Sequence, residues 1–92
     1  MTSDLDHRIS AAQRRRKACL EKSKEPMTLA RKLRLKRRAH FHGRLLNSLR
    51  RNYYALADLL QADRIKAYEE RIRELRDAAE LATPSTYQPR TA

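Results

Sequence analysis

Residues 45–82, LLNSLRRNYYALADLLQADRIKAYEERIRELRDAAELA, carry two apolar stripes, each with the spacing of three and four residues that marks a packed helix face. The first stripe ends at Leu60 and the second begins at Ile65. This step of five residues means that the two stripes do not share one face of a straight helix. The predicted packing and oligomerisation residues are Leu46, Leu49, Tyr53, Leu56, Leu60, Ile65, Tyr68, Ile72 and Leu75.

Two architectures satisfy this pattern. In the first, the chain turns near residues 61–63, Asp63 caps a new helix, and the two stripes face each other in an antiparallel helical hairpin. In the second, one long helix shifts its seam and forms an oligomeric coiled coil. Residues 61–63 contain neither glycine nor proline, so the turn signal is weak and both architectures stay open.

The composition predicts an all-α protein. The chain has one glycine and no valine, and isoleucine occurs only at positions 9, 65 and 72, whereas Ala, Leu, Arg, Lys and Glu are abundant. Cys19 has no partner for an intrachain disulfide. No run of 18 apolar residues and no secretory signal core occur. We therefore expect an intracellular protein, in the cytoplasm or in the nucleoid or nucleus, with no membrane contact.

Proline and capping signals divide the chain. A first helix is expected from about Ser3 to Lys24, because Pro26 disfavours helical geometry in the residue before it. Thr28 is a predicted N-cap, and from there to about Ala62 no proline interrupts the helical pattern. The expected segments are a basic N-terminal helix or arm at 1–25, an arginine-rich helical segment at 26–44, a packing or oligomerisation element at 45–82 and an irregular tail at 83–92.

The positive charge is concentrated before the apolar seam. Residues 26–52 contain nine Lys or Arg and no acidic residue. When the segment is projected on one helix, the face of the leucine seam extends toward the N-terminus, and there it is occupied by Arg31, Arg34 and Arg38. Solvated helix faces usually mix charges of both signs, so this segment is expected to leave its protein neighbours and meet a polyanion.

Arginine outnumbers lysine seven to two in residues 26–52, which favours forked contacts to phosphate over simple charge attraction. We therefore predict nucleic-acid binding, with RNA or a place in a ribonucleoprotein slightly favoured over DNA. The run at 14–17 is expected to act as a second arm. The predicted binding residues are Arg14, Arg15, Arg16, Lys17, Arg31, Lys32, Arg34, Lys36, Arg37, Arg38 and Arg44.

The competing interpretation is a helical adaptor or assembly subunit that docks its basic half on an acidic protein surface. Catalysis is not expected, since no serine or cysteine has a base at a suggestive spacing and one glycine cannot build a phosphate loop. His40 and His42 are two residues apart and point in different directions on a helix, so no metal site or cofactor is predicted.

Overall fold

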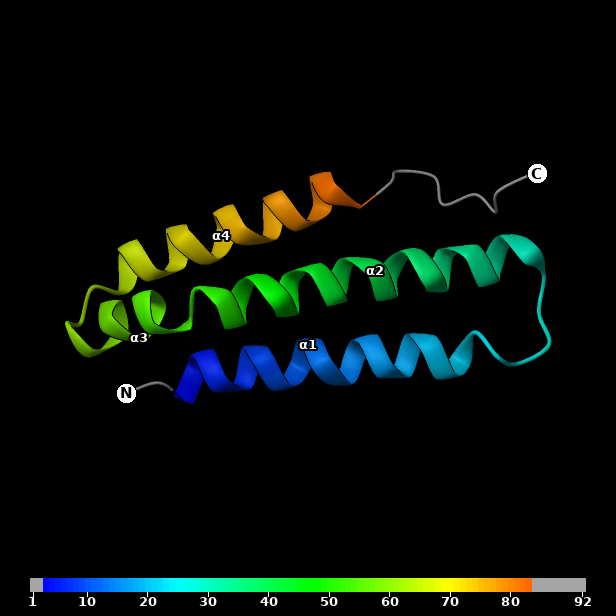
Figure 1. The fold of residues 1–92 in the computed structure, drawn as a ribbon, viewed down its shortest axis with the longest axis horizontal. Coiled ribbons are helices and arrows are strands. Elements are labelled where there is room, and N and C mark those ends of the chain that lie inside the picture. The colour runs from blue at the N-terminus through cyan, green and yellow to red at the C-terminus, as the bar shows by residue number, and fades with distance from the viewer. Residues whose placement is uncertain (1–2, 84–92) are drawn as a thin grey trace.

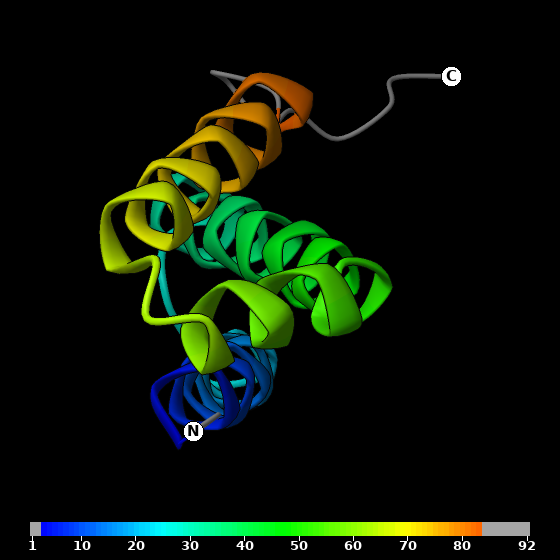
Figure 2. The same ribbon diagram turned by 90° about the vertical axis from the view of Figure 1, so that its left-hand side faces the viewer.

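The computed structural model describes residues 3–83. They form α1 (Ser3–Lys22), α2 (Leu29–Arg51), α3 (Tyr53–Gln61) and α4 (Ile65–Ala82), which confirms the all-α prediction. Helix α2 is central, and α1 and α4 pack against it, both antiparallel to it (Figure 1). The view along the long axis separates α1 from α4, with α2 between them (Figure 2). The predicted irregular tail lies, apart from Thr83, outside the described residues.

The chain reverses direction between α3 and α4, so the two stripes form the helical hairpin. Asp63 has a φ of 56°, its N–H donates to the carbonyl of Leu60 (3.1 Å), and the N–H of Arg64 donates to that of Leu59 (2.9 Å). These two bonds are the Schellman arrangement that ends a helix. Asp63 therefore ends α3, and the expectation that it caps the next helix is wrong, because Arg64 holds that position.

The helix boundaries on either side of Pro26 were expected, and the boundary at Asn52 was not. The predicted N-cap is confirmed, because the Thr28 side chain accepts a hydrogen bond from the Arg31 N–H (3.3 Å). The predicted continuous helix from residue 28 to residue 62 is wrong, because it breaks at Asn52, whose φ of −100° and ψ of 13° lie outside the helical range. The Asn52 side-chain amide donates to the Ser48 carbonyl (2.8 Å), which gives the bend a local partner. The first helix ends at Lys22.

The hydrophobic core lies where all four helices meet. Five of the nine predicted packing residues are buried there, and a sixth, Leu46, is buried outside this cluster. Tyr53 and Leu60 are half-buried beside the core, and Ile65 is 43% exposed at the first position of α4. Leu5 from α1 is completely buried in the same core. The core residues are Leu5, Leu45, Leu49, Leu56, Ala57, Tyr68, Ile72, Leu75 and Ala79.

The start of α1 is fastened to this core by polar contacts. The Tyr68 hydroxyl donates to Asp4 (2.6 Å), the Arg8 Nε donates to the same carboxylate (2.9 Å), and the Tyr53 hydroxyl donates to Asp6 (2.9 Å). The hydrogen bonds from Tyr68 and Arg8 lower the pKa of Asp4. Burial and the hydrogen bond to Asp4 raise the pKa of Tyr68 to about 12. The two tyrosine bonds fix the start of α1 against α3 and α4.

Candidate nucleic-acid interface

The two predicted basic segments lie side by side. The second half of α1 runs antiparallel to the first half of α2, joined by the connection at residues 23–28 (Figure 1). Residues 14–44, called here the basic hairpin, contain 13 Lys or Arg and 2 Glu. The rest of the chain contains nine basic and nine acidic residues. The basic hairpin alone therefore accounts for the net charge of +11.

The first half of α2 has a protein neighbour, which corrects one expectation. Ala39 and His42 are buried where α1 crosses, so this half of α2 does not leave the protein as the projection suggested. At Gly43 a Cβ atom would lie 3.1 Å from the Arg16 Nε, so the glycine allows the Arg16 side chain to pass close to α2. The prediction failed because the apolar stripe of α1 is thin and its contacts use small residues such as Ala12.

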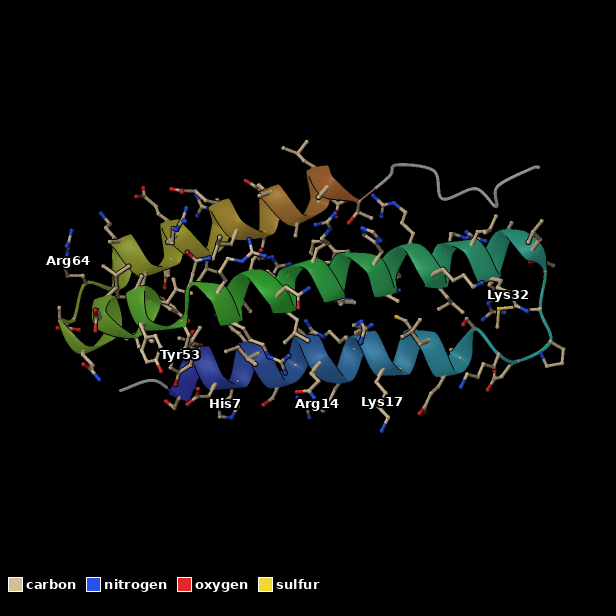
Figure 3. The ribbon with its side chains drawn as sticks, in the orientation of Figure 1. His7, Arg14, Lys17, Lys32, Tyr53 and Arg64 are labelled. Carbon is tan, nitrogen blue, oxygen red and sulfur yellow. The ribbon has the colours of Figure 1, made fainter. Side chains whose placement is uncertain are left out.

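The predicted binding residues fall into three groups. Arg14 and Lys17 project from α1 away from α2 (Figure 3), and Arg31, Arg34 and Lys36 are likewise exposed, while Lys32 is half-buried. Arg16, Arg37 and Arg44 contact the protein itself, at Gly43, Glu80 and His40 respectively. Arg15 and Arg38 line hollows beside α4.

Little negative charge offsets the basic hairpin. Within residues 3–83 the ion pairs are Arg8–Asp4, Arg71–Glu74 and Arg37–Glu80. Only the last includes a residue of the basic hairpin. Most of the cationic side chains there consequently face solvent without a carboxylate partner, and their mutual repulsion favours binding of an anion.

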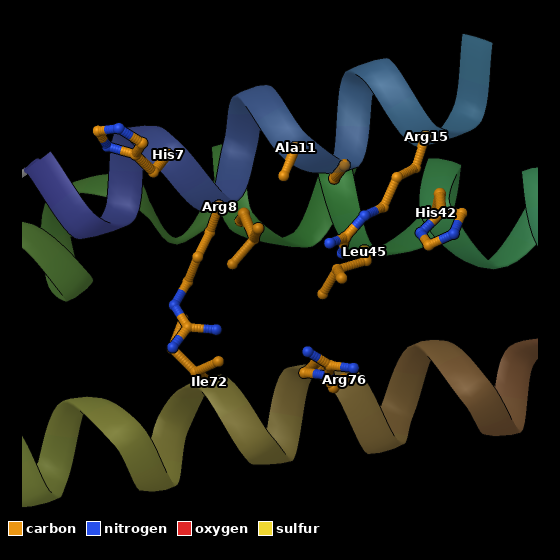
Figure 4. A pocket seen from close by; sticks show the side chains of 10 residues that line it. His7, Arg8, Ala11, Arg15, His42, Leu45, Ile72 and Arg76 are labelled. Carbon is orange, nitrogen blue, oxygen red and sulfur yellow. The ribbon is translucent and has the colours of Figure 1, made fainter. Parts of the chain in front are cut away.

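A cleft of about 310 Å³ lies between α1 and α4, and residues of α2 line its base. Arg8 and Arg15 extend from α1 toward α4, and Arg76 extends from α4 toward them (Figure 4). The apolar part of the lining includes Leu45, Leu49 and Ile72. A second hollow of about 460 Å³ shares Arg15, His42 and Arg76 with the first and adds Arg37, Arg38, Phe41 and Glu80.

Sequence reasoning missed Arg76. It lies four residues before Glu80, the spacing of an intrahelical ion pair, and so reads as part of the mixed-charge face of α4. In the structure Glu80 instead pairs with Arg37 of α2, which leaves Arg76 at the cleft. No local sequence signal predicts this exchange of partners, because it depends on how α4 docks.

His42 lies where the two hollows meet. The residue is only 9% exposed, and its Nδ1 is buried without a hydrogen-bond partner among the described residues. Burial lowers the pKa of His42, and the positive charges of Arg15, Arg38 and Arg76 lower it further. The ring is therefore neutral at pH 7. Its neighbour Phe41 packs against the core and meets the ring edge to face, with centroids 5.2 Å apart.

Other site types gain no support from the geometry. In the part of the chain that the structure describes, no three His, Cys, Asp or Glu residues gather closely enough to hold a metal ion. Among residues 3–83 no helix has the combined length and apolar character needed to cross a membrane. Comparison with family models, curated proteins and solved structures finds no match. The function must therefore be inferred from this chain's own residues.

Proposed function

We propose that the protein binds nucleic acid through phosphate contacts made by the basic hairpin, with a slight preference for RNA, alone or within a ribonucleoprotein. The observation that carries the proposal is charge segregation: residues 14–44 hold the whole net charge of +11. Their exposed side chains have almost no carboxylate partners among the described residues. A phosphate backbone supplies the missing counter-charge and releases its own counterions on binding.

The shape of the basic hairpin supports RNA over insertion into DNA. A single α-helix has a diameter of about 10–12 Å and fits the DNA major groove, which is about 12 Å wide. Here the exposed cations lie on two helices packed together, so the pair is too wide to enter that groove as a unit. A cationic surface of this width instead suits phosphates spread over a folded RNA.

The test is fluorescence anisotropy with labelled structured RNA and duplex DNA over a series of salt concentrations. The variant Arg31→Gln/Arg34→Gln/Lys36→Gln removes three exposed charges from the basic hairpin. Each lost phosphate contact should reduce the slope of log K against log salt by roughly 0.7–0.9. The matched variant Arg51→Gln/Arg64→Gln/Arg73→Gln removes the same charge elsewhere and should bind almost as the parent does.

Two outcomes would overturn the proposal: no binding to either nucleic acid at low salt, or equal weakening by both variants. An acidic peptide of matched charge belongs in the same experiment. Tighter binding to the peptide than to RNA would favour the alternative, an adaptor that docks on an acidic protein.

We further propose that the protein works inside the cell as part of a larger assembly or a homo-oligomer. Leu29, Tyr54 and Leu81 are strongly exposed apolar or aromatic residues, which supports a further protein contact. Sedimentation equilibrium with and without RNA tests self-association. A strictly monomeric protein in both conditions would contradict the homo-oligomer.

A further inference from the structure

Three guanidinium groups from three helices line the second hollow, and two of them also line the first. Arg15 comes from α1, Arg38 from α2 and Arg76 from α4, and none has a hydrogen-bond or ion-pair partner among residues 3–83. Glu80 is the carboxylate lining the second hollow, and its Oε1 accepts from Arg37. The junction of the two hollows therefore holds a concentration of positive charge that the described residues do not neutralise.

His42 gives an independent indication of a missing ligand. It is nine-tenths buried at this same junction, and its Nδ1 has no partner. A proton on that enclosed nitrogen would be a buried donor with no acceptor, which costs about 1–3 kcal/mol. A phosphate oxygen that reached Nδ1 would supply this missing acceptor, so the unpartnered nitrogen itself indicates an anion at the junction.

Beside the cationic junction, one side of the first hollow is apolar. Leu45, Leu49 and Ile72 border it, and its volume of about 310 Å³ lies within the range of small-ligand sites. A ligand that matches both parts has a compact anionic group and a planar or apolar group attached to it. A nucleotide has this construction, and its base can leave the stack to contact protein side chains.

We infer that one phosphate group binds where the two hollows meet, through Arg15, Arg38, Arg76 and His42, with the rest of a single nucleotide in the first hollow against Leu45, Leu49 and Ile72. The assignment of the phosphate to a nucleotide rests on the proposed function. The phosphate site itself rests on the geometry of the cleft. Two of its arginines, Arg15 and Arg38, belong to the basic hairpin, whose other exposed cations contact the backbone without selecting a unit of it.

The first test uses sulfate as the probe, since it remains a dianion over the relevant pH range. NMR of the histidine ring carbons and protons follows His42 at constant ionic strength in chloride. Sulfate should shift the His42 signals saturably and raise its pKa, because the anion offsets the surrounding arginines. Affinity should therefore increase as the pH falls through the range in which His42 gains a proton.

Other charged and titratable groups that face the cleft also contribute to the titration of His42. His7 and Arg8 border it on α1, and Arg37 and Glu80 border the adjoining hollow. Arginines keep their charge throughout the titration. His40 lies on a different hollow of α2 and provides an internal control whose signals should respond little.

Paired variants separate a specific site from general charge attraction. Arg76→Gln should weaken sulfate binding roughly tenfold, as expected for one lost charge-assisted contact. Arg73→Gln on the same helix removes the same charge away from both hollows and should leave binding almost unchanged. Circular dichroism checks that both variants keep the parent helicity.

The outcomes separate this inference from the proposed function. Equal weakening by Arg73→Gln and Arg76→Gln, or equal shifts of His40 and His42, would overturn the phosphate site even if RNA binds the basic hairpin. Saturable, Arg76-dependent sulfate binding would support the site even if no RNA binds. A nucleoside 5′-monophosphate should bind more tightly than inorganic phosphate, and equal affinities would overturn the assignment to a nucleotide.

Discussion

The two ends of the same helices differ in what their side chains do. At the core end, meaning residues 3–13 and 45–83, Leu5, Leu49 and Leu56 are completely or almost completely buried. In the basic hairpin the large apolar residues Leu20 and Leu29 are exposed, and the buried residues are Ser23, Ala39 and His42. The core end contains eight basic and nine acidic residues, a net charge of −1, whereas the basic hairpin carries +11. Buried apolar contacts and net positive charge are thus concentrated in different halves of one bundle.

This division explains how so small a chain tolerates its charge. A net charge far from zero destabilises a compact state through self-repulsion. The repulsion here is concentrated where few apolar groups are buried, while α1 and α2 are both anchored in the core at the other end. The helices of the basic hairpin are anchored in the core at their other ends. Most side chains of the hairpin are therefore not needed for the core and remain available to contact an anion.

The largest expected effect comes from removing core volume. Leu56→Ala truncates a fully buried side chain and should lower the free energy of unfolding by about 2–5 kcal/mol. Leu29→Ala truncates the corresponding side chain in the basic hairpin, where it is 61% exposed, and should cost less than about 1 kcal/mol. Urea unfolding followed by circular dichroism measures both. Similar losses for the two variants would break the contrast between the ends.

The next largest effect concerns the contact that fastens α1 to the core end. Tyr68→Phe removes the hydroxyl that donates to Asp4 and should cost about 1.5–3 kcal/mol at pH 7, because the acceptor is a charged carboxylate. The bond lowers the pKa of Asp4 below 3.8, so its contribution is present at neutral pH and is lost as the pH falls through the folded-state value. The gap between parent and variant should therefore close in acid.

The same bond has an alkaline limit. Tyr68 has its pKa raised from 10.0 to about 12, so the folded protein keeps the hydroxyl proton that the unfolded chain releases. Its contribution should be complete below pH 10 and should decline as the pH rises toward about 12. Unfolding free energies of parent and Tyr68→Phe across this range measure the decline. A difference independent of pH would contradict the assigned contact.

The helical class and the leucine seam could be predicted from the sequence because composition and periodicity are local signals. Leu46, Leu49 and Leu56 lie on a predicted stripe and are buried. The complete burial of Leu5 could not be predicted in the same way, because the apolar stripe of α1 is thin and the burial depends on how α1 docks. Likewise, the bend at Asn52 comes from a side-chain hydrogen bond that also occurs in unbroken helices.

The candidate site was predictable in part for the same reason. Charge counting identifies residues 14–44, but it cannot separate Arg14, which faces solvent, from Arg15, which lines the cleft. That distinction depends on the position of α4. Arg76 became part of the site only because Glu80 pairs across helices with Arg37 instead of within α4.

A smaller effect is expected at the turn that makes the core end possible. Asp63 adopts a φ of 56°, a conformation that costs a non-glycine residue about 1–2 kcal/mol. Asp63→Gly relieves that cost but gives the unfolded chain more freedom, so we expect a net stabilisation of up to about 1 kcal/mol. Asp63→Ala keeps the strain without the polar side chain and should be destabilising. Thermal unfolding of both variants tests the turn, and the reverse order would contradict the Schellman geometry.

The smallest effect is expected where the two regions join. Gly43→Ala gains helix propensity worth about 1 kcal/mol, but the new Cβ would lie 3.1 Å from the Arg16 Nε and 3.3 Å from its Cδ. Arg16 is an exposed, flexible side chain, so it can move by a few tenths of an ångström, and the net result should be a stabilisation below about 1 kcal/mol. The double variant Gly43→Ala/Arg16→Ala removes the close contact and should recover the full propensity gain. If Gly43→Ala alone destabilises while the double variant does not, the Arg16 side chain cannot move away from Gly43 as expected.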